Sequence, residues 1–155
     1  MMDRSTDRSP HGIQARVRVT DDSDLVVVRR RVRELAARQG LSGADTESLA
    51  TAVTEVARNI VVHAGGGEVL FGALGAAPMC GVIVIAHDSG PGIPSIEQAM
   101  QDGYSTKGGL GYGLAGARRL VDEFEIESTV DAGTTITLRK WASASHSACS
   151  QSRSS

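Results

Sequence analysis

The sequence has few aromatic residues. Two Phe, two Tyr and Trp141 make up 3% of its 155 residues. Stacking platforms for nucleic acid bases depend on aromatic side chains, so this scarcity argues against such a platform and requires an aliphatic core. A basic excess is also lacking, because 16 Lys and Arg stand against 18 Asp and Glu and leave a formal net charge of −2. We therefore expect no nucleic acid partner.

Cysteines and long apolar runs are scarce as well. The only two cysteines are Cys80, in an apolar run, and Cys149, in a polar tail. This placement excludes a disulfide framework and a cysteine-based zinc site and favours a reducing compartment. The longest apolar run, 82–86, is far shorter than the roughly 20 residues that cross a bilayer, and the first residues are polar and partly acidic, unlike a targeting segment. We expect a soluble, cytoplasmic protein that does not bind membranes.

Glycine, by contrast, is abundant. Its 18 residues concentrate between Gly65 and Gly133, which favours a backbone that approaches a ligand closely there. The length suits one domain with a core of its own. Residues 1–12 show no periodicity and 143–155 are Ser-rich with little to bury, so we expect two disordered tails around a single domain, 13–142.

The hydrophobic pattern predicts an α+β fold with helices packed on one face of a mixed β-sheet. Apolar residues alternate over 13–20 as in a half-buried strand, and they recur at helical spacing over 25–36 and 49–64, where Asp45 or Thr46 is the expected cap of the second helix. The remaining expected elements are strands at 69–74 and 82–86, a helix at 114–121, and a hairpin formed by 124–130 and 135–138.

Three polar residues form a first candidate site. Glu55, Asn59 and His63 are spaced four apart on the second predicted helix and share one stripe along it. A carboxylate and a carboxamide at the edge of a buried face suit a hard cation and can take a proton from a hydroxyl. A solvated helix flank is the alternative reading, and for His63 a structural role near the helix end is favoured.

A second candidate site follows the strand at 82–86. Asp88 comes at the end of this strand, and Gly90 and Gly92 flank a proline directly after it. This arrangement gives a fixed carboxylate beside open backbone, suited to a planar ligand with an exocyclic amine such as adenine. An ordinary Asp-Ser-Gly turn is the alternative, and His87, expected to face away from Asp88, is read as structural.

A third candidate site is the glycine-rich run 108–116, which leads into a predicted helix. Exposed backbone N–H groups at a helix start favour an anion, so phosphate binding is the natural interpretation. Gly111, Gly113 and Gly116 also match the dinucleotide fingerprint. That match is weak because polar loop, not a strand, precedes the glycines. No P-loop pattern is present.

Four motifs together resemble the boxes of the GHKL ATPase superfamily. In chain order they are Glu55-x-x-x-Asn59, Asp88-x-Gly90-x-Gly92-Ile93, Gly109-Leu110-Gly111-x-Gly113-Leu114 and Gly133-Thr134. The stretch 102–128 is similar to the RsbT group, the small serine kinases of the bacterial stressosome that are related to the anti-sigma kinases RsbW and SpoIIAB. The resemblance covers about 13–141 and implies a Bergerat-type sandwich.

The resemblance also implies roles for the matched residues, with ATP and Mg²⁺ as cofactors. Glu55 would be the catalytic base on the incoming serine, Asn59 would bind Mg²⁺, and Asp88 would hold the adenine amine, with Thr134 joining through water. Segment 102–109 would be a short ATP lid. The implied nucleotide contacts are Asn59, Asp88, Gly90, Gly92, Ile93, Thr106, Lys107, Gly108, Gly109, Leu110, Gly111, Gly113, Leu114 and Thr134.

Two functions stay open at this point. The resemblance favours an ATP-dependent serine/threonine kinase that phosphorylates a STAS-domain regulator, similar to RsbS or RsbR, in a partner-switching pathway of bacterial stress signalling. The alternative is an RsbW-like anti-sigma factor that sequesters a sigma factor. A phosphatase-type activator or a sigma factor is the expected second partner. Five arginines at 29–38 and acids at 122–125 predict a polarised surface that could steer charged partners.

Overall fold

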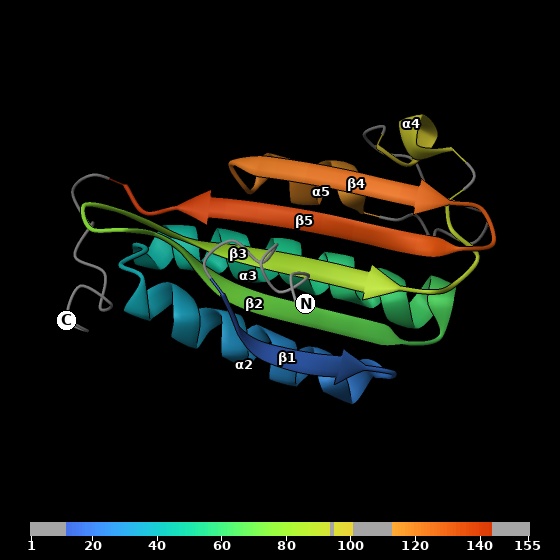
Figure 1. Ribbon diagram of the computed structural model, residues 1–155, viewed down its shortest axis with the longest axis horizontal. Helices are drawn as coiled ribbons and strands as arrows, with labels where there is room; N and C mark the ends of the chain where they lie inside the picture. Colours follow the sequence, from blue (N-terminus) through green and yellow to red (C-terminus); the bar gives the residue numbers. More distant parts are fainter. Residues whose placement is uncertain (1–11, 94, 101–112, 144–155) are drawn as a thin grey trace, which may run out of the picture.

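The computed structural model describes residues 12–93, 95–100 and 113–143. Five strands form one sheet in the order β1-β2-β3-β5-β4 (Figure 1), and each neighbouring pair is antiparallel. The α+β class is confirmed, but the predicted mixed sheet is wrong, because tight hairpins join β2 to β3 and β4 to β5 and a hairpin pairs its strands antiparallel. The strands are β1 (Ile13–Val19), β2 (Gly67–Ala76), β3 (Met79–Asp88), β4 (Glu123–Thr129) and β5 (Gly133–Trp141).

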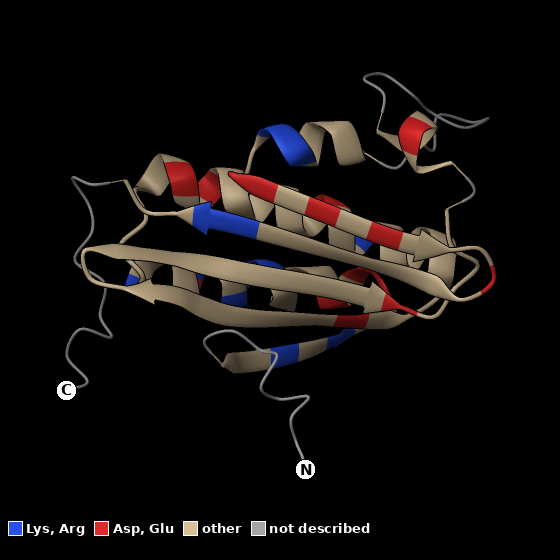
Figure 2. Cartoon of the chain, turned by 45° about the horizontal axis from the view of Figure 1, so that its top comes forward, with Lys and Arg blue, Asp and Glu red and all other residues tan. Residues whose placement is uncertain are grey.

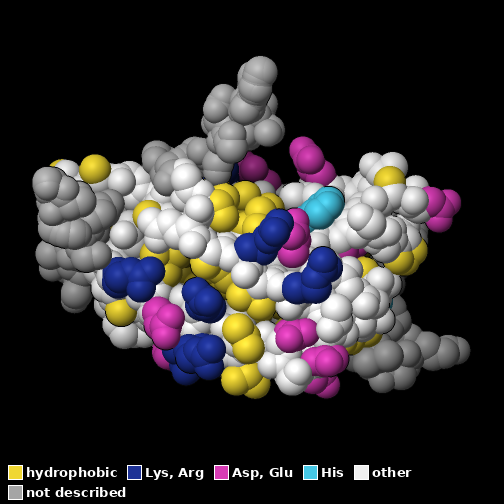
Figure 3. All heavy atoms as spheres, turned by 60° about the horizontal axis from the view of Figure 1, so that its bottom comes forward, with side chains coloured by type: hydrophobic (Ala, Val, Ile, Leu, Met, Phe, Trp, Pro, Cys, Tyr) yellow, Lys and Arg dark blue, Asp and Glu magenta, His cyan; other side chains and the backbone are white. Residues whose placement is uncertain are grey.

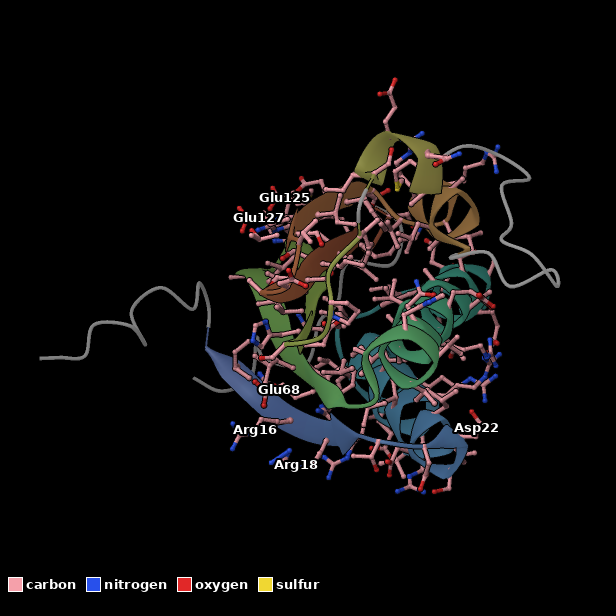
Figure 4. The ribbon with its side chains drawn as sticks, turned by 90° about the vertical axis from the view of Figure 1, so that its right-hand side faces the viewer. Arg16, Arg18, Asp22, Glu68, Glu125 and Glu127 are labelled. Carbon is pink, nitrogen blue, oxygen red and sulfur yellow. The ribbon has the colours of Figure 1, made fainter. Side chains whose placement is uncertain are left out.

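Helices α2 (Asp22–Arg38) and α3 (Gly43–Asn59) cover one face of this sheet. Viewed along the layers, Figure 4 shows the sheet on one side of the molecule and these two helices on the other. The labelled side chains of Arg16, Glu68 and Glu125 extend from the opposite face. The remaining helical segments are the π-helix η1 (Ile60–Ala64) and the short helices α4 (Ile96–Ala99) and α5 (Leu114–Arg119).

Local hydrogen bonds fix where the two long helices begin. Asp21 caps α2 and forms a capping box with Asp24, whose carboxylate accepts from the Asp21 and Thr20 N–H groups. Ser42 caps α3, and its hydroxyl accepts from the Asp45 N–H at 3.0 Å. The predicted cap of α3 at Asp45 or Thr46 is therefore wrong, because Ser42 offers a capping oxygen one turn earlier.

The core lies between the sheet and the helices and is aliphatic apart from one aromatic side chain. Phe71 on β2 is 1% exposed, and Leu49 on α3 and Val28 on α2 are fully buried. The predicted apolar faces of both helices point into this core. The outer face of the sheet carries charges of opposite sign at its two edges, where Figure 2 shows acidic residues along β4 and basic residues on β1. One hydrophobic cluster therefore joins the sheet to the helices in the described residues.

Cys80 corrects an expectation about the cysteines. Its side chain is buried at the start of β3 and is disulfide-bonded. The chain's other cysteine, Cys149, lies outside the described residues. The sequence around Cys80 carries no recognisable cysteine spacing pattern, so the sequence could not predict this bond. Among the helices of the described residues, none has the length and apolar character that a membrane crossing needs.

Candidate functional site

A pocket opens between the end of α3, the end of β3 and the start of β5. These three segments meet at the right-hand end of the ribbon in Figure 1. The pocket is narrow, because the space open to the centres of water-sized spheres within it is only about 20 Å³. Its walls are mostly apolar, with a few polar groups among them. The lining residues are Val56, Asn59, Ile60, His63, Ala64, Ala86, Asp88, Pro91, Gly92, Ile93, Thr134 and Ile136.

Asp88 supplies the buried carboxylate of this pocket. It is the last residue of β3 and only 9% exposed. Its Oδ1 accepts a hydrogen bond from the Gly90 N–H at 2.9 Å, which fixes the orientation of the carboxylate. A carboxylate offers more acceptor positions than this one bond uses, so it can also accept from a ligand donor. The sequence prediction of a fixed carboxylate at the end of the strand is confirmed.

Hydroxyl groups on β4 and β5 form hydrogen bonds at the side of the pocket that β5 lines. Thr134 pairs with Asp88 across the β3–β5 ladder and with Ser128 across the β4–β5 ladder. The Ser128 and Thr134 hydroxyl oxygens lie 2.8 Å apart, and the Ile93 N–H donates to Ser128 Oγ at 2.7 Å. Ser128 thus connects the loop after β3 to the final hairpin. The sequence analysis missed this residue, although the alternation of the predicted hairpin could have placed it opposite Thr134.

Gly92 allows the loop after β3 to pass close to the hairpin. Its φ is +82°, and a Cβ there would lie 2.4 Å from the Thr129 carbonyl oxygen. A larger residue would be strained in this conformation and would also clash. Ile93, the next residue, is buried and lines the pocket. The two predicted nucleotide contacts at 92 and 93 therefore do reach the pocket.

The predicted stripe of three polar residues on α3 divides into two parts. Asn59 and His63 both line the pocket, His63 from within η1. Glu55, one turn earlier, lies outside the lining. Its Oε2 accepts from Arg58 Nη1 at 3.1 Å, and its Oε1 faces Gly113. His63, for which a structural role was favoured, is therefore also one of the residues that line the pocket.

Gly113 begins α5 and brings the end of the glycine-rich segment to Glu55. It has a φ of +66°, and a Cβ on it would lie 2.7 Å from Glu55 Oε1. Leu114 follows it and is fully buried in the core. The other residues predicted to contact phosphates lie outside the described residues: Thr106, Lys107, Gly108, Gly109, Leu110 and Gly111.

Comparison with known proteins agrees with this arrangement. Residues 19–140 match the family model of the histidine kinase-like ATPase domain. The chain belongs to this family. It is 41% identical over 128 residues to the serine/threonine-protein kinase RsbT of Bacillus subtilis, a match that covers 83% of this chain and 96% of RsbT. It is 32% identical over 106 residues to an anti-sigma F factor of Bacillus licheniformis, covering 64% of this chain and 71% of that protein.

Solved structures support the same fold. The RsbU and RsbW domains of Rv1364c from Mycobacterium tuberculosis match 82% of this chain with a TM-score of 0.53 and 24% identity, and the chain spans 32% of that larger protein. The catalytic domain of the histidine kinase ThkA matches 86% of this chain and 99% of its own length, with a TM-score of 0.50 and 16% identity. At these identities the likeness concerns the fold alone.

The residues present fit the cofactors of this family. An apolar pocket with a single buried carboxylate suits adenine, which has two flat apolar faces and one exocyclic amine. Mg²⁺ usually takes only one or two protein ligands and completes its shell with phosphates and waters. Asn59 lines the pocket, and its side-chain oxygen would be such a ligand. The described residues contain no cluster of three or more His, Cys, Asp or Glu side chains that would hold a metal without nucleotide.

Proposed function

We propose that the protein is an ATP-dependent serine/threonine kinase that phosphorylates a STAS-domain regulator in a bacterial partner-switching pathway. The proposal draws on the relative RsbT, a serine/threonine kinase that aligns with the chain over nearly its whole length. The observation that supports it in this structure is that two polar residues at the end of α3 lie on different sides of the pocket boundary. Asn59 faces a pocket with a buried carboxylate, while Glu55 lies outside that pocket, against Gly113.

Each of these residues then has a defined task. Asp88 accepts a hydrogen bond from the adenine amine, and Asn59 binds Mg²⁺, which neutralises negative charge on the phosphates when it is bound. Glu55 accepts the proton of the substrate serine. At the same time the serine oxygen forms a bond to the γ-phosphorus, and the bond between that phosphorus and the leaving oxygen of ADP breaks. Glu55 is suited to this step because it lies outside the nucleotide pocket and is partly exposed to an approaching protein.

The partners are proposed from the relatives. The substrate is a STAS-domain protein similar to RsbS or RsbR, and the second partner is a phosphatase-type activator, all in the cytoplasm. Two arginines of the predicted cluster on α2 are already paired, because Arg29 and Arg33 contact Glu47 on α3 at 3.7 and 2.8 Å. Figure 3, which views the molecule from the side of α2 and β1, shows acidic and basic side chains intermingled. Arg30 and Arg31 are therefore the better candidates for steering a partner.

Anti-sigma activity is the second candidate function. Its support is the set of anti-sigma F factors that align with the chain at 30–34% identity. These alignments cover 58–64% of the chain, against 83% for RsbT. A pull-down with sigma factors and STAS-domain proteins as competing baits separates the two functions. Retention of a sigma factor together with failure to phosphorylate any STAS-domain protein would favour the anti-sigma function.

A phosphotransfer assay tests the catalytic assignment. The purified protein is incubated with an RsbS-like STAS-domain protein and ATP labelled at the γ-phosphate. We expect label on the STAS-domain protein, a loss of about 10²- to 10⁴-fold in rate for Glu55→Gln, and unchanged nucleotide affinity by calorimetry. Glu47→Gln is the matched control, since Glu47 is an exposed carboxylate on the same helix, paired with Arg33. Full turnover in Glu55→Gln would overturn the assignment of the base.

A further inference from the structure

The two carboxylate oxygens of Glu55 have different surroundings. Oε2 accepts from Arg58, three residues later on the same helix, at 3.1 Å. Oε1 points to Gly113, where the backbone approaches so closely that even a methyl group on Gly113 would lie 2.7 Å from it. One oxygen is thus held by a cation, and the other faces the start of α5.

This arrangement restricts a side chain that is otherwise free to move. Glu55 is 40% exposed, and a glutamate with that much solvent around it can occupy several rotamers. The contact with Arg58 selects a rotamer in which Oε1 faces Gly113, the last glycine of the motif that the resemblance assigns to phosphate binding. The missing side chain at Gly113 leaves space for the carboxylate in that position.

We propose that Arg58 is a positioning residue of the phosphotransfer reaction. It holds Oε2 of Glu55 so that Oε1 is directed to the place where the serine hydroxyl meets the γ-phosphate. This inference rests on the proposed function, because it gives Arg58 a role only through Glu55 as the base. Arg58 itself does not touch substrate or nucleotide in this role.

A plain surface ion pair is the competing explanation. Exposed pairs three residues apart on a helix are common and contribute little to stability. The two explanations differ in what they predict for catalysis. Misplacing a reacting group by about 1 Å can cost about 10²-fold in rate, whereas the loss of a surface ion pair leaves the rate unchanged. Kinetic measurements therefore distinguish a positioning role from a structural one.

The experiment compares variants of Arg58 in the full chain, with an RsbS-like STAS-domain protein as substrate. For Arg58→Ala we expect kcat to fall about 10- to 100-fold while the KM for ATP and the calorimetric affinity for ADP stay unchanged. Arg58→Lys should recover most of the rate, because one contact to a single oxygen can be made by an ammonium group. Arg33→Ala is the matched control, since it breaks a 2.8 Å ion pair to Glu47 away from the pocket lining.

A double variant links the effect to Glu55. If Arg58 acts through the base, Arg58→Ala should cause no further loss of rate in a Glu55→Gln background, because residues that act as a unit are not additive. An unchanged kcat in Arg58→Ala, while Glu55→Gln is inactive, would overturn this inference and leave the proposed function standing. A raised KM for ATP would overturn it too, in favour of direct phosphate contact. Activity in Glu55→Gln would overturn both proposals.

Discussion

Replacing Asp88 with asparagine tests the adenine pocket most directly. The substitution keeps the shape of the side chain, and the amide oxygen can still accept from the Gly90 N–H, which Asp88 Oδ1 does at 2.9 Å. The amide nitrogen must then occupy the position of the second carboxylate oxygen. It presents hydrogen-bond donors to the adenine amine, which is itself a donor, so the expected contact is replaced by an unfavourable one.

The expected size of the effect follows from the burial of this group. Asp88 is 9% exposed, so water cannot easily replace the lost partner. Hydrogen bonds to charged groups contribute about 1.5–3 kcal/mol. Since about 1.4 kcal/mol corresponds to a tenfold change in affinity, we expect ATP to bind Asp88→Asn about 10- to 150-fold more weakly. Thermal unfolding should change little, because the bond from Gly90 is retained.

Calorimetry with a non-hydrolysable ATP analogue and with inosine triphosphate provides the measurement. Inosine carries a carbonyl oxygen where adenine carries the amine, so the asparagine amide can donate to it, whereas the aspartate carboxylate would face another acceptor. We expect the parent to prefer the ATP analogue and Asp88→Asn to prefer inosine triphosphate. Equal affinity of parent and variant for the ATP analogue, or the same loss for both nucleotides, would refute the proposed hydrogen bond.

Two further substitutions test a tight loop at the site and the capping box of α2. Gly92→Ala places a Cβ at a residue with a φ of +82°, within 2.4 Å of the Thr129 carbonyl oxygen. We therefore expect the free energy of unfolding, measured in urea, to fall by about 1–3 kcal/mol. An unchanged free energy of unfolding would contradict the inferred strain. The Thr20 N–H, and after it the Asp21 N–H, hold the pKa of Asp24 below its ordinary value. A carboxyl whose pKa is lower in the folded state stabilises the fold above its unfolded pKa, and this contribution is lost as the pH falls through the folded pKa. The Tm of Asp24→Asn should therefore be below that of the parent at neutral pH, and the two should converge in acid; a constant difference across that range would count against the capping role.

Hydrophobic periodicity was sufficient to predict most of the fold. Burial alternates along β1 as the pattern 13–20 required, and the five buried residues of α2 are those with helical spacing. Strands β2 and β3 extend beyond their predicted limits, because they continue pairing through residues with no apolar alternation, such as Gly67 and Met79. Helix α4 was missed since four residues are too few to show a period.

The site was predictable where a residue's position depends on local sequence. Asp88 follows an apolar strand, so its place at the strand end could be derived from the chain alone. The contact of Ser128 with the Ile93 N–H could not, because it joins two segments whose distance depends on how the hairpin packs. For the same reason the approach of Gly113 to Glu55 was not foreseen, although both residues were singled out as candidates.

The position of His63 beside Asn59 depends on a feature that regular helical spacing does not describe. Residues 55, 59 and 63 would share one stripe on a continuous α-helix, but the helix widens into the π-helical turn η1 directly after Asn59. A π-turn contains more residues per turn, so the residues after it are rotated relative to those before. His63 thereby reaches the pocket wall beside Asn59, while Glu55 stays on the regular part of α3, next to Arg58 and Gly113. The same irregularity brings Ile60 into the pocket as an apolar wall. The division between Asn59 and Glu55 has a simpler cause, because both lie on the regular part of α3 and one helical turn, a rise of about 6 Å, separates them, so that Glu55 lies just outside the pocket.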